Sequence, residues 1–161
     1  MAFSSQIKIK SNAVEIICYL FILLFVYAAA GKLLDFEEFR VQIGQTPMLS
    51  AFANNIAGAV PAIEILVSLM LFIPKLRLKG LFAAFSLMIM FTTYIIIILN
   101  FTSYIPCSCG GVLEELGWTE HLIFNLIFIL LALTAIILIN NSNNYIKSEG
   151  SFSSSFKTSQ A

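Results

Sequence analysis

The stretch VEIICYLFILLFVYAAAGKLL, from Val14 to Leu34, carries charged side chains only at Glu15 and Lys32. A helix rises 1.5 Å per residue, so about 20 apolar residues cross the roughly 30 Å hydrocarbon core of a bilayer. Three further apolar runs of similar length follow, at Phe52–Ile73, Gly80–Phe101 and Leu122–Ile139. The sequence therefore predicts an all-α membrane protein built as a bundle of four transmembrane helices.

The composition of the whole chain agrees with this class. Hydrophobic residues make up 59% and charged residues 11% of the 161 residues, whereas an average soluble domain is roughly 45–50% apolar. Nine basic residues balance nine acidic ones, so the chain has no basic surplus of the kind that binds nucleic acid. One His and three Cys exclude a Cys₄ or Cys₂His₂ zinc centre built from this chain alone. We expect the lipid bilayer as a partner, no nucleic acid and no metal.

The distribution of Lys and Arg predicts the orientation in the membrane. Basic residues occur in the N-terminal tail, in the connection Lys75–Lys79 and in the C-terminal tail, whereas the connection Thr102–His121 has none. Cytoplasmic loops are enriched in Lys and Arg. We therefore expect a multi-pass protein of the cell (inner) membrane with both termini cytoplasmic and residues 102–121 facing the exterior or periplasm.

Three segments are expected along the chain. Residues 1–12 form a cytoplasmic N-terminal tail, residues 13–140 the four-span membrane domain, and residues 141–161 a disordered cytoplasmic tail rich in Ser and Asn. An alternative reading takes the first apolar run as a signal peptide cleaved after Ala28-Ala29-Ala30. The apolar Leu33-Leu34, which continues the run past that position, favours a retained span.

Cys107 and Cys109 lie one residue apart in the connection between the third and fourth spans, within Pro106-Cys107-Ser108-Cys109-Gly110-Gly111. A disulfide wants Cα atoms about 4.4–6.8 Å apart, whereas two extended residues span about 6.6–7.2 Å. The backbone must therefore bend, and the flanking Pro and Gly residues favour a bend. An exposed, strained disulfide exchanges readily. The pattern indicates a redox pair; the alternatives are two thiols that never pair and half of a metal site.

Two ionisable residues inside the apolar runs are further candidates, because burying a charge in a membrane is costly. Glu64 lies near the middle of the second run and Lys32 near the outer end of the first. Glu64 could relay protons or bind a cofactor, with or without Lys32, or the pair could only hold helices together. His121 opens the fourth run, where an imidazolium would lower the pKa of a nearby thiol. Cys18 is expected to be a buried apolar residue outside the site.

These residues resemble the methylamine utilisation protein MauE family, within the DoxX-like membrane superfamily. The resemblance is carried by Tyr27–Phe36, by Pro61-Ala62-Ile63-Glu64 and by Pro106–Gly111 followed by Gly117-Trp118, and it covers roughly residues 14–140. The C-x-C-G-G element before the last span is its specific part. The Gly-Lys and mid-span Glu elements are shared more widely among DoxX-like proteins.

The resemblance implies a role in forming or maintaining disulfides in an exported partner. In the methylamine pathway that partner is methylamine dehydrogenase, helped by the thioredoxin-like companion MauD. Cys107 and Cys109 carry over as the redox pair, and Lys32 and Glu64 as positions that matter for the bundle. Quinone is a candidate cofactor, by analogy with four-helix membrane oxidoreductases, which would make the chain a thiol–disulfide oxidoreductase.

Two other functions remain open on the sequence alone. A DoxX-like chain could act as a non-catalytic membrane subunit or anchor of an oxidoreductase, and its cysteines would then be dispensable. A small transporter is less favoured, since many transporters need paired broken helices and the sequence gives no sign of them.

Overall fold

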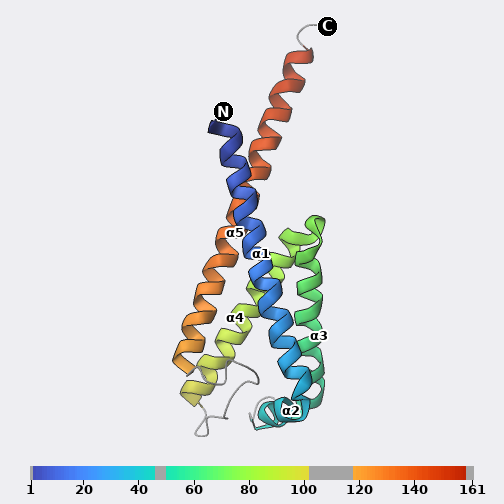
Figure 1. The fold of residues 1–161 in the computed structure, drawn as a ribbon, viewed down its shortest axis with the longest axis vertical. Helices are drawn as coiled ribbons and strands as arrows, with labels where there is room; N and C mark the ends of the chain where they lie inside the picture. The colour runs from blue at the N-terminus through green and yellow to red at the C-terminus, as the bar shows by residue number, and fades with distance from the viewer. Residues whose placement is uncertain (1, 46–49, 102–117, 159–161) are drawn as a thin grey trace.

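The computed structural model describes residues 2–45, 50–101 and 118–158, and every regular element within these ranges is a helix (Figure 1). The elements in chain order are α1 (Ala2–Leu34), α2 (Phe36–Gly44), the 3₁₀ turn η1 (Ser50–Phe52), α3 (Ala53–Phe72), the 3₁₀ turn η2 (Pro74–Leu76), α4 (Arg77–Phe101) and α5 (Trp118–Thr158).

Four segments of these helices are long and apolar enough to cross a membrane: Asn12–Leu34, Ser50–Phe72, Pro74–Ile97 and Thr119–Asn141. The predicted four-span helical bundle is confirmed. The third span begins earlier than the sequence pattern indicated, because the helical turn after Pro74 joins α4 with little interruption.

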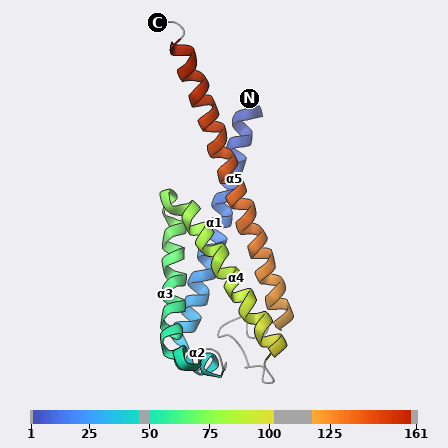
Figure 2. The same ribbon diagram turned by 180° about the vertical axis from the view of Figure 1, so that it is seen from behind.

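The helices pack as two neighbouring pairs, α1 along α3 and α4 along α5, which contact each other to form the bundle (Figures 1 and 2). The ring of Phe21 on α1 meets Phe128 on α5 edge-on, with centroids 5.2 Å apart and an interplanar angle of 84°. On α4 and α5, Ala84, Ala132 and Ala135 are fully buried. Small side chains let transmembrane helices approach closely, so these alanines allow α4 and α5 to pack against each other at short range.

A tight turn joins α3 to α4. Ile73 adopts an extended conformation (φ −84°, ψ 115°) before Pro74, as residues that precede proline commonly do. Gly80 then passes close to the end of α3, where a Cβ atom would lie 3.0–3.1 Å from side-chain and backbone atoms of Leu71. Glycine at this position allows the first turn of α4 to approach α3.

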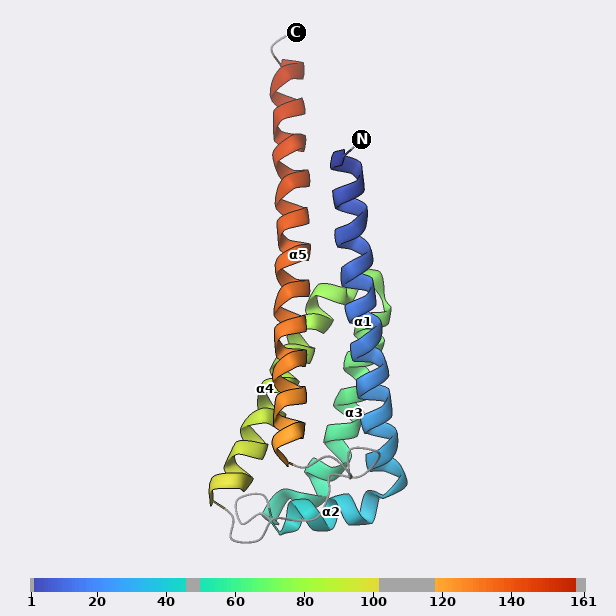
Figure 3. The same ribbon diagram turned by 60° about the vertical axis from the view of Figure 1, so that its left-hand side comes forward.

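The short helix α2 lies across one end of the bundle (Figure 3). This helix was not among the elements predicted from the sequence. Its signal is the apolar spacing of Phe36, Phe39 and Ile43 on one helical face. Ile43 and Gln42 are buried, so α2 closes the bundle at this end.

The helix α5 continues beyond the fourth span into the segment where the sequence predicts a tail from residue 141. The structure continues α5 as a helix to Thr158. No proline occurs between Trp118 and Thr158, so nothing in this segment removes a backbone donor or forces the helix to end.

The two ends of the bundle differ in charge. At one end Arg77 of α4 forms an ion pair with Glu15 of α1, at 3.2 Å, close to Lys75 and Lys79 in the chain. At the other end lie α2, the C-terminal end of α4 and the N-terminal end of α5 (Figure 1).

Candidate functional site

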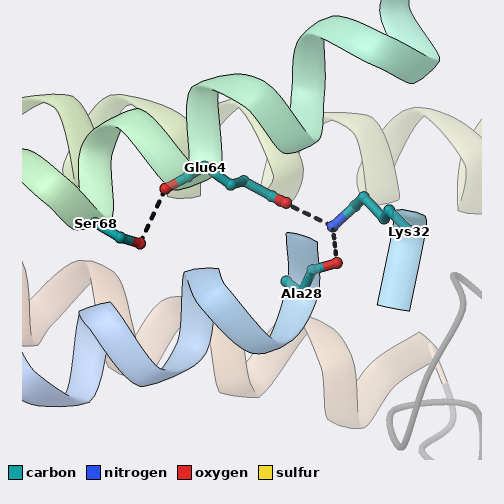
Figure 4. A network of polar contacts seen from close by, with 4 residues as sticks. All are labelled: Ala28, Lys32, Glu64 and Ser68. Atoms are coloured by element: carbon teal, nitrogen blue, oxygen red, sulfur yellow. Dashed lines mark hydrogen bonds and ion pairs between the residues drawn. The ribbon is translucent and has the colours of Figure 1, made fainter. Parts of the chain in front are cut away.

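Lys32 and Glu64 form an ion pair inside the bundle (Figure 4). Lys32 Nζ lies 2.8 Å from Glu64 Oε1, and the side chains are 14% and 0% exposed. The pair joins α1 to α3, and its two residues are 32 positions apart in the sequence. The two ionisable residues that the sequence singled out within the apolar runs are therefore partners.

The end of α1 orients Lys32 toward this contact. Helical side chains lean toward the N-terminus of their helix, and Lys32 Nζ reaches back to the carbonyl oxygen of Ala28, 3.4 Å away, one turn earlier. The rings of Phe39 and Phe91 lie 5.8 Å and 5.5 Å from Nζ, within the range of cation–π attraction. The ammonium group thus has partners on α1, α2, α3 and α4.

Glu64 is held one turn after Pro61 in α3, where both residues are buried. Its Oε1 accepts the bond from Lys32, but Oε2 is buried and has no hydrogen-bond partner among the described residues. The Ser68 hydroxyl donates to the backbone carbonyl of Glu64 (3.0 Å) and not to the carboxylate (Figure 4). One oxygen of the carboxylate therefore remains available to a further donor.

The ion pair forms part of the wall of a cavity of about 650 Å³ lined by residues of α1, α2, α3, α4 and α5. Ligand sites in proteins commonly measure about 300–1,000 Å³ and combine apolar walls with a few converging polar groups. Its walls are mainly aliphatic and aromatic, and its polar or charged side chains are these: Tyr27, Lys32, Gln42, Glu64, Thr93, Tyr94, His121 and Asn125. The composition fits a mostly apolar ligand that carries a few polar atoms.

His121 and Asn125, one turn apart on α5, contribute two more polar groups to this cavity. Asn125 is 3% exposed, and neither its Nδ2 nor the Nδ1 of His121 has a hydrogen-bond partner among the described residues. A buried polar group without a partner costs about 1–3 kcal/mol. The structure thus brings His121 beside the same cavity as Lys32 and Glu64.

The cavity is partly open. Ile63 of α3 and Met90 of α4 both line it and are themselves 42% and 48% exposed, within segments long enough to span the membrane. A ligand could therefore enter from the lipid side.

The three cysteines fall in different places. Cys107 and Cys109 lie outside the described residues. Cys18 is 1% exposed, packs with Phe21 in the apolar core and does not line the cavity. The structure therefore agrees with the view of Cys18 as a buried apolar residue.

Sequence reasoning missed five of the cavity's eight polar or charged residues as site candidates: Tyr27, Gln42, Thr93, Tyr94 and Asn125. Gln42 was missed because α2 was not expected. Asn125 was missed although an amide within an apolar run is the same kind of signal that identified Glu64.

The fold and the site define a class: a four-span membrane protein with a buried ion pair beside a partly open, largely apolar cavity. The family model described as "Methylamine utilisation protein MauE" matches residues 10–138, which include all four spans except the last few residues of the fourth, and also Cys107 and Cys109. The chain belongs to this family, as the sequence motifs predicted. No curated protein and no solved structure matches the chain significantly.

Proposed function

We propose that this MauE-family protein is an integral membrane thiol–disulfide redox protein, with Cys107 and Cys109 as its redox pair. The observation that supports this most is the motif Cys107-Ser108-Cys109-Gly110-Gly111 itself, which falls within the residues matched by the family model.

The chemistry is disulfide exchange. A thiolate of a reduced partner attacks one sulfur of the Cys107–Cys109 disulfide, and a mixed disulfide forms while the other sulfur leaves as a thiolate. The second thiolate of the partner then displaces the attacked cysteine. The partner departs with a disulfide, and Cys107 and Cys109 are left as a dithiol that holds the two electrons.

The proposed partner is an exported thioredoxin-fold protein of MauD type, and the end result is the maturation of an exported client, methylamine dehydrogenase in the family's namesake pathway. The absence of Lys and Arg from residues 102–117, against three basic residues in Lys75–Lys79, supports an outward position of the redox pair in the inner membrane. Disulfides persist on that side of the membrane.

The decisive experiment traps the mixed disulfide. In cells carrying Cys107→Ala or Cys109→Ala, the remaining outer thiol can attack the disulfide of an oxidised partner, the reverse of the exchange above. The adduct then lacks the neighbouring cysteine, which is one of the two thiols that could resolve it, and should persist longer. We expect one of the two variants to accumulate a covalent adduct that is visible on a diagonal reducing gel. In acid-quenched cells the wild-type pair should be oxidised.

Cys18→Ala is the matched control, since Cys18 is buried and lies outside the motif. It should leave both the adduct and the oxidised state unchanged. Suppose that neither single variant forms an adduct and that the double Cys107→Ser, Cys109→Ser variant retains full activity in cells. The thiol role would then be wrong, and the chain would act as a non-catalytic membrane subunit.

A further inference from the structure

The cavity contains polar atoms that the protein itself leaves without partners. Asn125 Nδ2 is a donor and Glu64 Oε2 is an acceptor, and both residues are at least 97% buried. No atom of the described residues forms a hydrogen bond with either of these two atoms. A ligand that satisfies both offers an acceptor to Asn125 and, in at least one of its chemical states, a donor to Glu64.

The charges in the cavity restrict the ligand further. Lys32 and Glu64 are its charged residues, and they neutralise each other in an ion pair of 2.8 Å. A carboxylate or an ammonium ligand would bring a charge without a counter-charge into a low-dielectric site, which is strongly unfavourable. The ligand is therefore neutral.

Shape and access add two more restrictions. Aromatic rings from four helices line the cavity, among them Phe25 of α1, Phe39 of α2, Phe91 of α4 and Phe124 of α5, and such walls favour a planar ring. Ile63 and Met90 connect the cavity to the lipid-facing surface. The ligand is therefore planar and soluble in lipid.

We infer that this cavity binds a lipid-soluble para-quinone, with one ring oxygen accepting a hydrogen bond from Asn125 and the other directed to Lys32 and Glu64. A quinone is neutral and planar, and its carbonyl acceptors become hydroxyl donors on reduction. The reduced ring thus supplies the donor that Glu64 Oε2 lacks, while Asn125 Nδ2 can donate to a ring oxygen in both states.

The electron balance connects this site to thiol chemistry, a step that rests on the proposed function. When Cys107 and Cys109 form their disulfide, two S–H bonds break and two electrons and two protons are released. A quinone takes up both electrons and both protons, and its two C=O groups become C–OH groups. Dithiol plus quinone then gives disulfide plus quinol, with no further reactant.

The test measures binding in a protein that lacks the outer thiols. Purified Cys107→Ser, Cys109→Ser protein in detergent is titrated with decylubiquinone by isothermal calorimetry, and with decylbenzene, which has a similar ring and chain but no carbonyl groups. We expect saturable binding of one decylubiquinone per chain and none of decylbenzene. Loss of one hydrogen bond in Asn125→Leu should weaken binding about fivefold.

Ser68→Ala is the matched control, because Ser68 is also buried and polar but does not line the cavity. It should bind decylubiquinone as tightly as the parent protein. Each variant is first checked for an unchanged elution volume and melting temperature; if Asn125→Leu does not fold, Asn125→Ala, which removes the amide donor without adding bulk or charge, replaces it.

Absence of saturable decylubiquinone binding, equal binding of decylbenzene, or unchanged affinity in the Asn125 variant would each overturn the quinone site. These outcomes are independent of the trapped mixed disulfide. A protein that forms the adduct but binds no quinone would support the thiol role and refute the quinone site. A protein that binds quinone but forms no adduct would support the quinone site and refute the thiol role.

Discussion

Breaking the Lys32–Glu64 pair from either side should have unequal effects on stability. Lys32→Met leaves the carboxylate of Glu64, which is 0% exposed, without its cation, while its Oε2 already lacks a partner. Removing one partner of a buried ion pair typically costs 3–5 kcal/mol. Because Lys32 is 14% exposed and lies in the last turn of α1, we expect the lower end, about 3 kcal/mol.

Glu64→Gln should cost less, about 1–2 kcal/mol, because the amide oxygen still accepts a hydrogen bond from Lys32. The lysine also keeps its contacts with the Ala28 carbonyl and with the rings of Phe39 and Phe91. The double variant Lys32→Met, Glu64→Gln removes both charges at once. It should therefore be more stable than Lys32→Met alone, by about 2 kcal/mol, since no uncompensated charge remains.

The assay is reversible unfolding of the purified variants in mixed micelles, with the free energy extrapolated to zero denaturant. Arg40→Met is the control, because it breaks an ion pair with Glu37 whose side chains are 43% and 73% exposed and should change stability by less than about 0.5 kcal/mol. If the losses of the two single variants simply add in the double variant, the reasoning about an isolated buried charge is refuted.

The other predictions concern packing and topology. Gly80→Val should lower the melting temperature in detergent, with a cost of about 1–3 kcal/mol from overpacking, because a Cβ atom would lie 3.0–3.1 Å from the end of α3. Gly58→Ala, where a Cβ atom meets nothing within 4 Å, should leave the melting temperature equal or higher, and an equal effect at both glycines would contradict the packing argument. A membrane-impermeant thiol reagent applied to intact, reduced spheroplasts should label Cys107 or Cys109 and not Cys18, whereas labelling of Cys18 alone would invert the proposed orientation.

The four spans were predictable because a membrane helix is a local property of the chain. The apolar run from Val14 to Leu34 needs no tertiary partner to be recognised, since length and hydrophobicity alone decide whether it can cross a bilayer. The helix α2 was missed for the opposite reason. It is nine residues long and has little net hydrophobicity, so it depends on packing against the bundle end, which a sequence does not display.

The candidate site was predictable only in part. Lys32 and Glu64 stood out because a charge inside an apolar run is rare, but their distance in space could not be read from positions 32 residues apart. The cavity was not predictable at all, since it is the space left where five helices fail to fill the interior. Asn125 gains its importance only from lining that space.

Stability alone does not account for the polar groups of this cavity. A buried ion pair is often no more stable than apolar side chains of similar volume, and an unpartnered Asn125 is a cost of about 1–3 kcal/mol. An apolar residue at each position would pack the bundle as well or better. The same groups become favourable once a neutral ligand with carbonyl or hydroxyl oxygens supplies their missing hydrogen bonds, and such a ligand would stabilise the fold by binding to it. The arrangement of Lys32, Glu64 and Asn125 is therefore better explained by what the cavity holds than by what keeps the helices together.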